Sequence, residues 1–377
     1  MDLKQYIDAY QFDSRRVEGN RVLSCLDFFD ENFNGNVLSY DVFIIGVPEG
    51  RLSIGNGSCA LAPDEIRSSL YELYEGEWDL KILDLGNLRI GQTVEDTYAI
   101  LEQLTTYLIQ RGGVLLVLGG GHDLMIPIYR GHCALGKPLN FASADAYLDF
   151  QDGDSCHSRS FLSHLLESNE SMLSTYSLFG YQTYLCDPKE VHLLNQMNFN
   201  LLRLGEVNSD LNEIEPYIRG LDHLSVDLSV VKSSESPANP YSSPNGMTAE
   251  GLCMMLRYAG LSNNVKSILF SELDPRLDKN SQSAKVYTQA IWYFLEGLHL
   301  RQDDLLTDKL SNFKKFHVHS ELSELIFYKS MLNDKWWVDF CNEQGSDANL
   351  LPCSSLDYKK AVEGELSGRI LKYIRFK

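Results

Sequence analysis

Three short segments of the sequence combine histidine, aspartate and glycine in patterns that suit a metal site. They are Gly119–Asp123 (GGGHD), Asp145–Asp149 (DAYLD) and Ser225–Ser229 (SVDLS). Imidazole and carboxylate groups are ligands that suit manganese or another hard divalent ion. In a strand Asp145 and Asp149 would face the same side but lie roughly 13 Å apart, at about 3.3 Å per residue. We therefore expect the chain to curl after Tyr147, because only then can both carboxylates reach one ion.

Two positions in these segments carry residues that bind metal poorly. Tyr147 follows Asp145 by two residues, and Ser229 follows Asp227 by two residues. A phenol with an ordinary pKa of about 10 and a serine hydroxyl are weak neutral ligands. The pattern therefore predicts a metal centre that has lost part of its ligand set.

The elements around these segments alternate between strands and helices. Helices are expected from Pro63 and at residues 94–108 and 248–258. Such alternation is typical of a parallel sheet that is covered by helices on both faces. Ligands bind beyond the carboxyl ends of the strands in these sheets, and the three segments above fall there. The expected strands are residues 41–48, 81–85, 114–118, 139–143, 178–179, 201–204, 223–226 and 267–270.

The pattern changes after Leu300. Residues 313–319, 324–330 and 336–340 resemble short antiparallel strands, and residues 358–375 resemble one helix. We therefore expect residues 1–300 to form the α/β domain and residues 301–377 to form an appended α+β module.

The amino-acid composition limits the kinds of binding partner and the cellular compartment that we expect. The chain has 377 residues, is 44% hydrophobic and carries a formal net charge of −19. This acidity makes nucleic acid and membrane surfaces poor partners. The first residues do not resemble a secretory signal, and the apolar run Val114–Leu118 is far too short to cross a bilayer. Eight cysteines without a C-x-x-C pair indicate reduced thiols, so we expect a cytoplasmic protein.

Taken in order, the motifs resemble those of the ureohydrolase superfamily, which contains arginase, agmatinase and formimidoylglutamase. The resemblance covers about residues 40–300, and the GGGH form is typical of formimidoylglutamases. The loop Pro237–Gly246 resembles that of formimidoylglutamase-like proteins of Bacteroidetes. The family implies a three-layer α/β/α fold, a mostly parallel sheet of about eight strands and a homo-oligomer. The segments that match are residues 45–48 (IGVP), 55–57, 62–67 (APDEIR), 117–123, 145–149, 225–229 and 271–275 (SELDP).

The resemblance also assigns metal ligands. In the family two Mn²⁺ ions share two bridging aspartates, which match Asp145 and Asp227. One ion adds a histidine and an aspartate that match His122 and Asp149, so its four ligands are all present. The other ion would need ligands where Tyr147 and Ser229 stand. The resemblance therefore implies at most one divalent ion, with manganese the expected metal; the alternative is that none is bound.

Catalytic roles follow from the same resemblance. His157 matches the family's proton-shuttling histidine, and Glu272 matches an acid near the substrate. Both would serve the attack of metal-activated water on a small amidine or guanidine. We expect a metal-dependent hydrolase of C–N bonds in linear amidines, most similar to formimidoylglutamase. The alternative function is that of a non-catalytic relative that acts as a binding or regulatory subunit. For Glu272 the alternative role is a salt bridge within the scaffold. Tyr147 could fill the space of the missing ion and form a hydrogen bond with Asp227.

Overall fold

A computed structural model describes residues 1–12, 19–151, 155–167, 172–197, 199–302, 312–319, 324–340 and 350–376. Its main element is a ten-stranded sheet in the order β1-β4-β3-β5-β10-β9-β6-β7-β8, in which β2 also pairs with β4. Every pair is parallel except β1 with β4. The strands are β1 (Ile7–Asp8), β2 (Leu26–Phe28), β3 (Val42–Gly46), β4 (Ile82–Leu88), β5 (Val114–Leu118), β6 (Leu139–Ala144), β7 (Leu173–Tyr181), β8 (Asn200–Arg203), β9 (His223–Asp227) and β10 (Ser267–Ser271).

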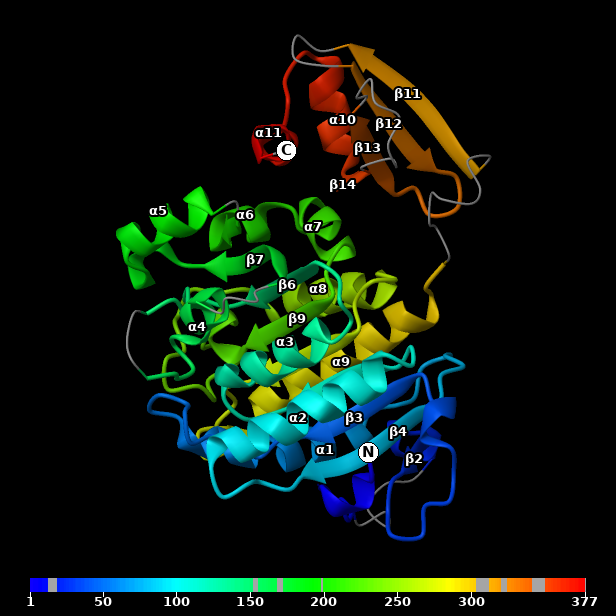
Figure 1. Ribbon diagram of the computed structural model, residues 1–377, viewed down its shortest axis with the longest axis vertical. Coiled ribbons are helices and arrows are strands. Elements are labelled where there is room, and N and C mark those ends of the chain that lie inside the picture. The colour runs from blue at the N-terminus through cyan, green and yellow to red at the C-terminus, as the bar shows by residue number, and fades with distance from the viewer. Residues whose placement is uncertain are drawn as a thin grey trace.

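Helices cover both faces of this sheet (Figure 1). One hydrophobic cluster packs the sheet against α1 (Ala62–Tyr71), α6 (Leu204–Ser209), α7 (Glu215–Arg219), α8 (Ala249–Leu261) and α9 (Gln282–His299). A second cluster packs the other face against α2 (Val94–Ile109), α3 (Met125–Cys133), α4 (Phe161–Glu167) and α5 (Pro188–Gln196).

Strand β5 shows why the sequence gives this three-layer arrangement. Val114, Leu116 and Leu118 belong to the first cluster, whereas Leu115 and Val117 belong to the second. Successive side chains of a strand point to opposite faces, so an unbroken apolar run is what a strand buried on both faces requires. The predicted α/β/α class with a mostly parallel sheet is thus confirmed. Eight strands that are neighbours across the sheet, in the order β4-β3-β5-β10-β9-β6-β7-β8, run parallel. Strands β1 and β2 both pair with β4.

The residues after α9 form a second, antiparallel sheet in the order β11-β12-β13-β14. Strands β11 (Phe313–His319), β12 (Glu324–Ser330) and β13 (Trp336–Phe340) have the predicted bounds, while β14 (Leu351–Cys353) was not predicted. Figure 1 shows this sheet at one end of the molecule, beside α10. The division at residue 300 stays a prediction.

One helix prediction in this region was wrong. Residues 358–375 do not form a single helix but contribute to α10 (Ser355–Val362) and α11 (Gly368–Phe376). Gly364 lies between them with a φ of 87°, a left-handed conformation that ends a helix. The spacing of apolar residues continued across the break, so it did not reveal the interruption.

No described helix is long and apolar enough to cross a membrane. The cysteines within the described residues are all free thiols, and Cys341 lies outside them.

The order of the central strands places the three ligand-bearing segments together. Strands β5, β10, β9 and β6 are neighbours in that order and run parallel. Their carboxyl ends therefore lie at one edge of the sheet. His122 follows β5, Glu272 follows β10, Asp227 ends β9 and Asp145 follows β6.

Candidate metal centre

Glycines after β5 let the chain turn sharply into His122. Gly119 and Gly120 have φ values of 80° and 79°, which non-glycine residues rarely adopt. A Cβ atom on Gly120 would also come within 2.7 Å of the Glu49 carbonyl oxygen. His122 then begins a short 3₁₀ turn, and its side chain is fully buried.

The chain after β6 curls as the sequence required. Strand β6 ends at Ala144, and the Tyr147 N–H donates to Asp145 Oδ1 over 2.9 Å. Asp149 has a φ of 50°, in the left-handed region. Such conformations are uncommon for non-glycine residues and cluster at functional sites. The curl brings the carboxylates of Asp145 and Asp149 to the same histidine.

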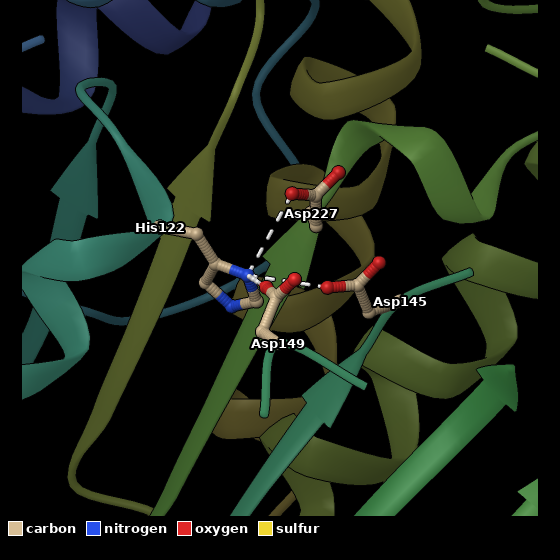
Figure 2. Close-up of side chains that lie close together, drawn as sticks. All are labelled: His122, Asp145, Asp149 and Asp227. Carbon is tan, nitrogen blue, oxygen red and sulfur yellow. Dashed lines mark hydrogen bonds and ion pairs between the residues drawn. The ribbon is translucent and has the colours of Figure 1, made fainter. Parts of the chain in front are cut away.

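Four side chains converge on one point, as Figure 2 shows. Nδ1 of His122 lies 2.8 Å from Asp149 Oδ2, 3.3 Å from Asp145 Oδ2 and 3.6 Å from Asp227 Oδ2. The four candidate ligand atoms all lie within 4.8 Å of one another. The structure thus brings together all four residues that the sequence predicted as ligands.

Ser225 sets the orientation of the His122 ring. Nε2 of His122 lies 2.8 Å from Ser225 Oγ, which in turn lies 2.7 Å from Ser143 Oγ. The Tyr176 hydroxyl donates to Ser143 Oγ over 2.7 Å. If Nε2 carries the ring proton and donates it to Ser225, the lone pair of Nδ1 points at the three carboxylates. Such partners of a ligating histidine fix its tautomer and orientation.

We therefore expect Ser225→Ala to weaken Mn²⁺ binding by about 10–100-fold, the usual cost of losing a partner of a ligating histidine. Titration of free Mn²⁺ by electron paramagnetic resonance would measure the change. Ser271→Ala is the matched control, because Ser271 is also buried but its hydroxyl donates to the Val226 carbonyl. Equal affinities of the two variants would contradict a role for Ser225 in orienting His122.

In the absence of a cation, the four groups strongly shift one another's pKa values. Burial lowers the pKa of His122, but its bonds with Asp145 and Asp149 outweigh burial and raise it well above the ordinary value. Burial and the Asp145 charge raise the pKa of Asp149, and they raise that of Asp227 to about 7. His122 holds the pKa of Asp145 below its usual value despite burial. A divalent ion would have to displace these protons, so its binding must strengthen as pH rises.

These residues fit one divalent ion. One imidazole nitrogen and three carboxylate oxygens form a hard donor set of the kind that Mn²⁺ accepts. Asp149 Oδ1 is buried and has no hydrogen-bond partner among the described residues. A buried carboxylate oxygen without a partner is costly, and a cation beside it would remove that cost.

The oxygens that would face a second ion already have partners. Asp145 Oδ1 accepts from the Ser229 hydroxyl over 3.0 Å and from the Tyr147 N–H. Asp227 Oδ1 accepts from the Ser229 N–H over 2.7 Å and from the Asn239 side chain over 3.5 Å. Of the donors at positions 147 and 229, only the Ser229 hydroxyl belongs to a side chain, so it alone is a consequence of the residue type at these positions.

The Tyr147 side chain does not follow the alternative considered from the sequence. No hydrogen bond joins its hydroxyl to Asp227 among the described residues. Its ring lies instead against the Arg159 guanidinium, with 3.6 Å from the guanidinium carbon to the ring centroid. No pattern in the sequence indicates this contact.

Glu272 is held beside the centre by protein donors. Its Oε1 accepts the His122 N–H over 3.0 Å, and its Oε2 accepts from Ser53 over 2.6 Å and from Asn56 over 2.7 Å. Glu272 is buried and has a φ of 62°. These donors are neutral, so they hold Glu272 in the scaffold without the salt bridge that the sequence alternative named, and a carboxylate with about four lone-pair sites could accept further donors. Sequence reasoning missed Ser53 and Asn56, whose only signal was their place in a glycine-rich loop.

The structure does not connect His157 directly to the four converging side chains. No hydrogen bond or ion pair joins its ring to the four converging residues within the described part of the chain. Its Nδ1 accepts the Arg159 N–H over 3.2 Å. Burial, then His164 and Arg159, lower its pKa, so the ring is neutral near pH 7 and carries its proton on Nε2. To take up a second proton, the ring must first release the Arg159 N–H.

Comparisons with known proteins identify the family. The model of the arginase family matches residues 40–296. The chain belongs to the arginase family. It is 24% identical to the formimidoylglutamase of Bacillus subtilis over 278 residues, which cover 68% of this chain and 87% of that protein. A formimidoylglutamase of Legionella pneumophila is 22% identical over 247 residues, or 62% of this chain and 77% of that protein.

Solved structures share the fold. The crystal structure of Trypanosoma cruzi formiminoglutamase with Mn²⁺₂ superimposes with a TM-score of 0.67 at 23% identity, covering 75% of this chain and 99% of that one. The Bacillus subtilis formimidoylglutamase structure gives 0.68 at 20% identity, covering 78% and 95%. The appended sheet after residue 312 lies beyond the segment that matches the family model.

Proposed function

We propose that this member of the arginase family is a formimidoylglutamase-like hydrolase that cleaves a C–N bond of a linear amidine and uses one divalent metal ion. The observation that carries the proposal is the convergence of four ligand atoms within 4.8 Å of one another. The similarity to formimidoylglutamases supports the substrate class.

Each residue has a definite part in this proposal. A divalent ion held by His122, Asp145, Asp149 and Asp227 would supply Lewis-acid chemistry to the hydrolysis. The Ser225 hydroxyl keeps the His122 ring turned toward the carboxylates. Glu272 holds the His122 backbone in place through its bond to the N–H. His157 remains our candidate for moving the proton, and it acts only when the Arg159 N–H leaves its Nδ1.

A substrate screen tests this proposal. Protein loaded with Mn²⁺ is incubated with formimidoylglutamate, arginine, agmatine and guanidinobutyrate, and released formamide, ammonia and urea are measured. We expect formamide from formimidoylglutamate and no urea from the three guanidines. Protein that binds one Mn²⁺ per chain yet hydrolyses none of the four compounds would refute the hydrolase proposal.

A second candidate function is a non-catalytic binding or regulatory subunit. The observation in its favour is that Ser229 supplies no carboxylate and that its hydroxyl donates to Asp145 Oδ1. Metal content separates the two candidates, because protein purified with manganese and found free of metal could not use the proposed chemistry. The homo-oligomer, the cytoplasmic location and the absence of nucleic-acid and membrane partners stay predictions.

A further inference from the structure

Arg159 is held between two tyrosine rings beside the metal centre. Its guanidinium carbon lies 3.6 Å from the centroid of the Tyr147 ring and 4.4 Å from that of the Tyr241 ring. The two rings are nearly perpendicular, with centroids 6.5 Å apart. Guanidinium groups on aromatic faces are stabilised by the ring quadrupole, more so when water is partly excluded.

The backbone around Arg159 is also fixed. The Arg159 carbonyl accepts the Gln151 N–H over 3.1 Å. On its other side, the Ser158 N–H donates to the Leu52 carbonyl over 3.0 Å, and Ser158 Oγ accepts the Ile54 N–H over 3.1 Å. The backbone position from which the Arg159 side chain extends is therefore fixed by the fold.

The three aspartates act on this guanidinium. Burial disfavours its charged form, yet the charges of Asp149, Asp145 and Asp227 outweigh burial and raise its pKa. Arg159 is thus a permanent cation, and its contact with the ring of Tyr147, which lies between Asp145 and Asp149 in the sequence, places it next to the ligand-bearing loop without a direct ion pair to these carboxylates among the described residues.

A count of charges explains why one cation would suit this centre. In the family, two divalent ions are matched by four carboxylates, one of them at the position where this chain has Ser229. Here three carboxylates remain, so one divalent ion leaves a net charge of −1. One guanidinium brings the sum over this ligand set to zero, while the Glu272 carboxylate beside it is stabilised by its own three donors. A buried charge is costly unless it is paired and hydrogen-bonded. Tyr147, which stands where the family has its other histidine ligand, is the ring on which that guanidinium lies.

We propose that Arg159 is a built-in substitute for the second metal ion: its guanidinium supplies the second positive charge of the centre, which therefore binds a single divalent ion. This inference deepens the proposed function and rests on metal binding at the His122 cluster, but not on turnover. It makes Arg159 a residue that tunes metal affinity and number.

Mn²⁺ affinity tests the inference. Arg159→Met removes the charge but keeps a long side chain, so the remaining ion loses a repelling neighbour; we expect its dissociation constant to fall by about tenfold or more. Arg159→Lys keeps the charge and should stay within about threefold of wild type. Free Mn²⁺ is titrated by electron paramagnetic resonance, and bound metal is counted by elemental analysis.

Arg111→Met is the matched control. Arg111 also lies on a tyrosine ring, 4.2 Å from the Tyr107 centroid, but it is exposed and precedes β5, at the opposite edge of the sheet from His122. Circular dichroism checks folding, and Arg159→Gln serves as a second neutral variant if Arg159→Met does not fold.

The outcomes separate this inference from the proposed function. A wild type that binds one Mn²⁺, with Arg159→Met binding it no more tightly, would overturn the role of Arg159 and leave the hydrolase proposal standing. Equal tightening by Arg159→Lys would also overturn it, because the charge would then be irrelevant. A wild type without metal and an Arg159→Met variant with one ion would overturn both this inference and the proposed function, because each requires the wild-type centre to bind one ion. Absence of metal from both proteins would overturn both.

Discussion

Replacing Asp145 and Asp227 together by alanine is expected to abolish Mn²⁺ binding and, with it, any hydrolysis of amidines. Each aspartate presents its Oδ2 to His122 Nδ1, at 3.3 Å and 3.6 Å, so the double substitution removes two of four ligand atoms. Loss of one indirect partner of a metal already costs about 10–100-fold in affinity, so loss of two direct ligands should cost at least about a thousandfold. Elemental analysis after dialysis against micromolar Mn²⁺ measures the remaining metal.

Asp222→Ala is the control for this prediction. Asp222 is buried and paired with Lys137 over 2.6 Å, but it precedes β9 and therefore lies at the opposite end of that strand from Asp227. It should lower stability without changing metal content. Formamide release that persists in the Asp145→Ala, Asp227→Ala protein would show that the reaction does not use this cluster.

The sequence was sufficient to predict the location of this cluster. Parallel strands end at one edge of the sheet, so glycine, histidine and aspartate placed after apolar runs lie along that edge. The family resemblance supplied the ligand set, and the strand order β5-β10-β9-β6 that brings these residues together was not predicted. The run Val114–Leu118 and the DAYLD segment after Leu139–Ala144 carried that information without any tertiary knowledge. The curl at Asp149 could also be inferred, because two carboxylates separated by four residues cannot share an ion in an extended strand.

Other features depended on contacts between distant segments. Ser53 and Asn56 bond to Glu272 across more than 200 residues of sequence, and serine and asparagine in a glycine-rich loop are ordinary turn residues. Arg159 acquires its role only when its loop places it between Tyr147 and Tyr241. No periodicity marks such a residue. Strands β1 and β2, with two and three residues, are likewise too short to leave a pattern.

The contacts of Ser229 change the meaning of its substitution. A serine at a ligand position suggests a simple loss, but its hydroxyl and N–H donate to Asp145 Oδ1 and Asp227 Oδ1. The Ser229 hydroxyl thus gives Asp145 Oδ1 a second donor beside the Tyr147 N–H. This arrangement fits the proposal that the centre takes one ion and that the Arg159 guanidinium supplies the second positive charge.

Restoring the two ligands should reverse this arrangement. We expect Tyr147→His with Ser229→Asp to raise bound Mn²⁺ from about one to about two ions per chain. The substitution at 229 removes the hydroxyl that occupies Asp145 Oδ1 and adds the fourth carboxylate. The smaller imidazole at 147 adds a nitrogen ligand, opens space and removes one face of the Arg159 stack. Elemental analysis and the spin-coupled signal of two neighbouring Mn²⁺ ions report the result.

The matched control is Tyr147→Phe with Ser229→Ala, which removes the same hydroxyl groups but adds no ligand; it should hold at most one ion. Adding Arg159→Met to the restored pair should tighten the second ion further, because the guanidinium then no longer competes for the same carboxylates. If a second ion binds only in this triple variant, Arg159 is the group that prevents it from binding in the double variant. If the double and triple variants both fold, judged by circular dichroism, and both hold only one ion, positions 147 and 229 are not the missing ligand positions, and a centre with one ion kept and one lost is the wrong description of this protein.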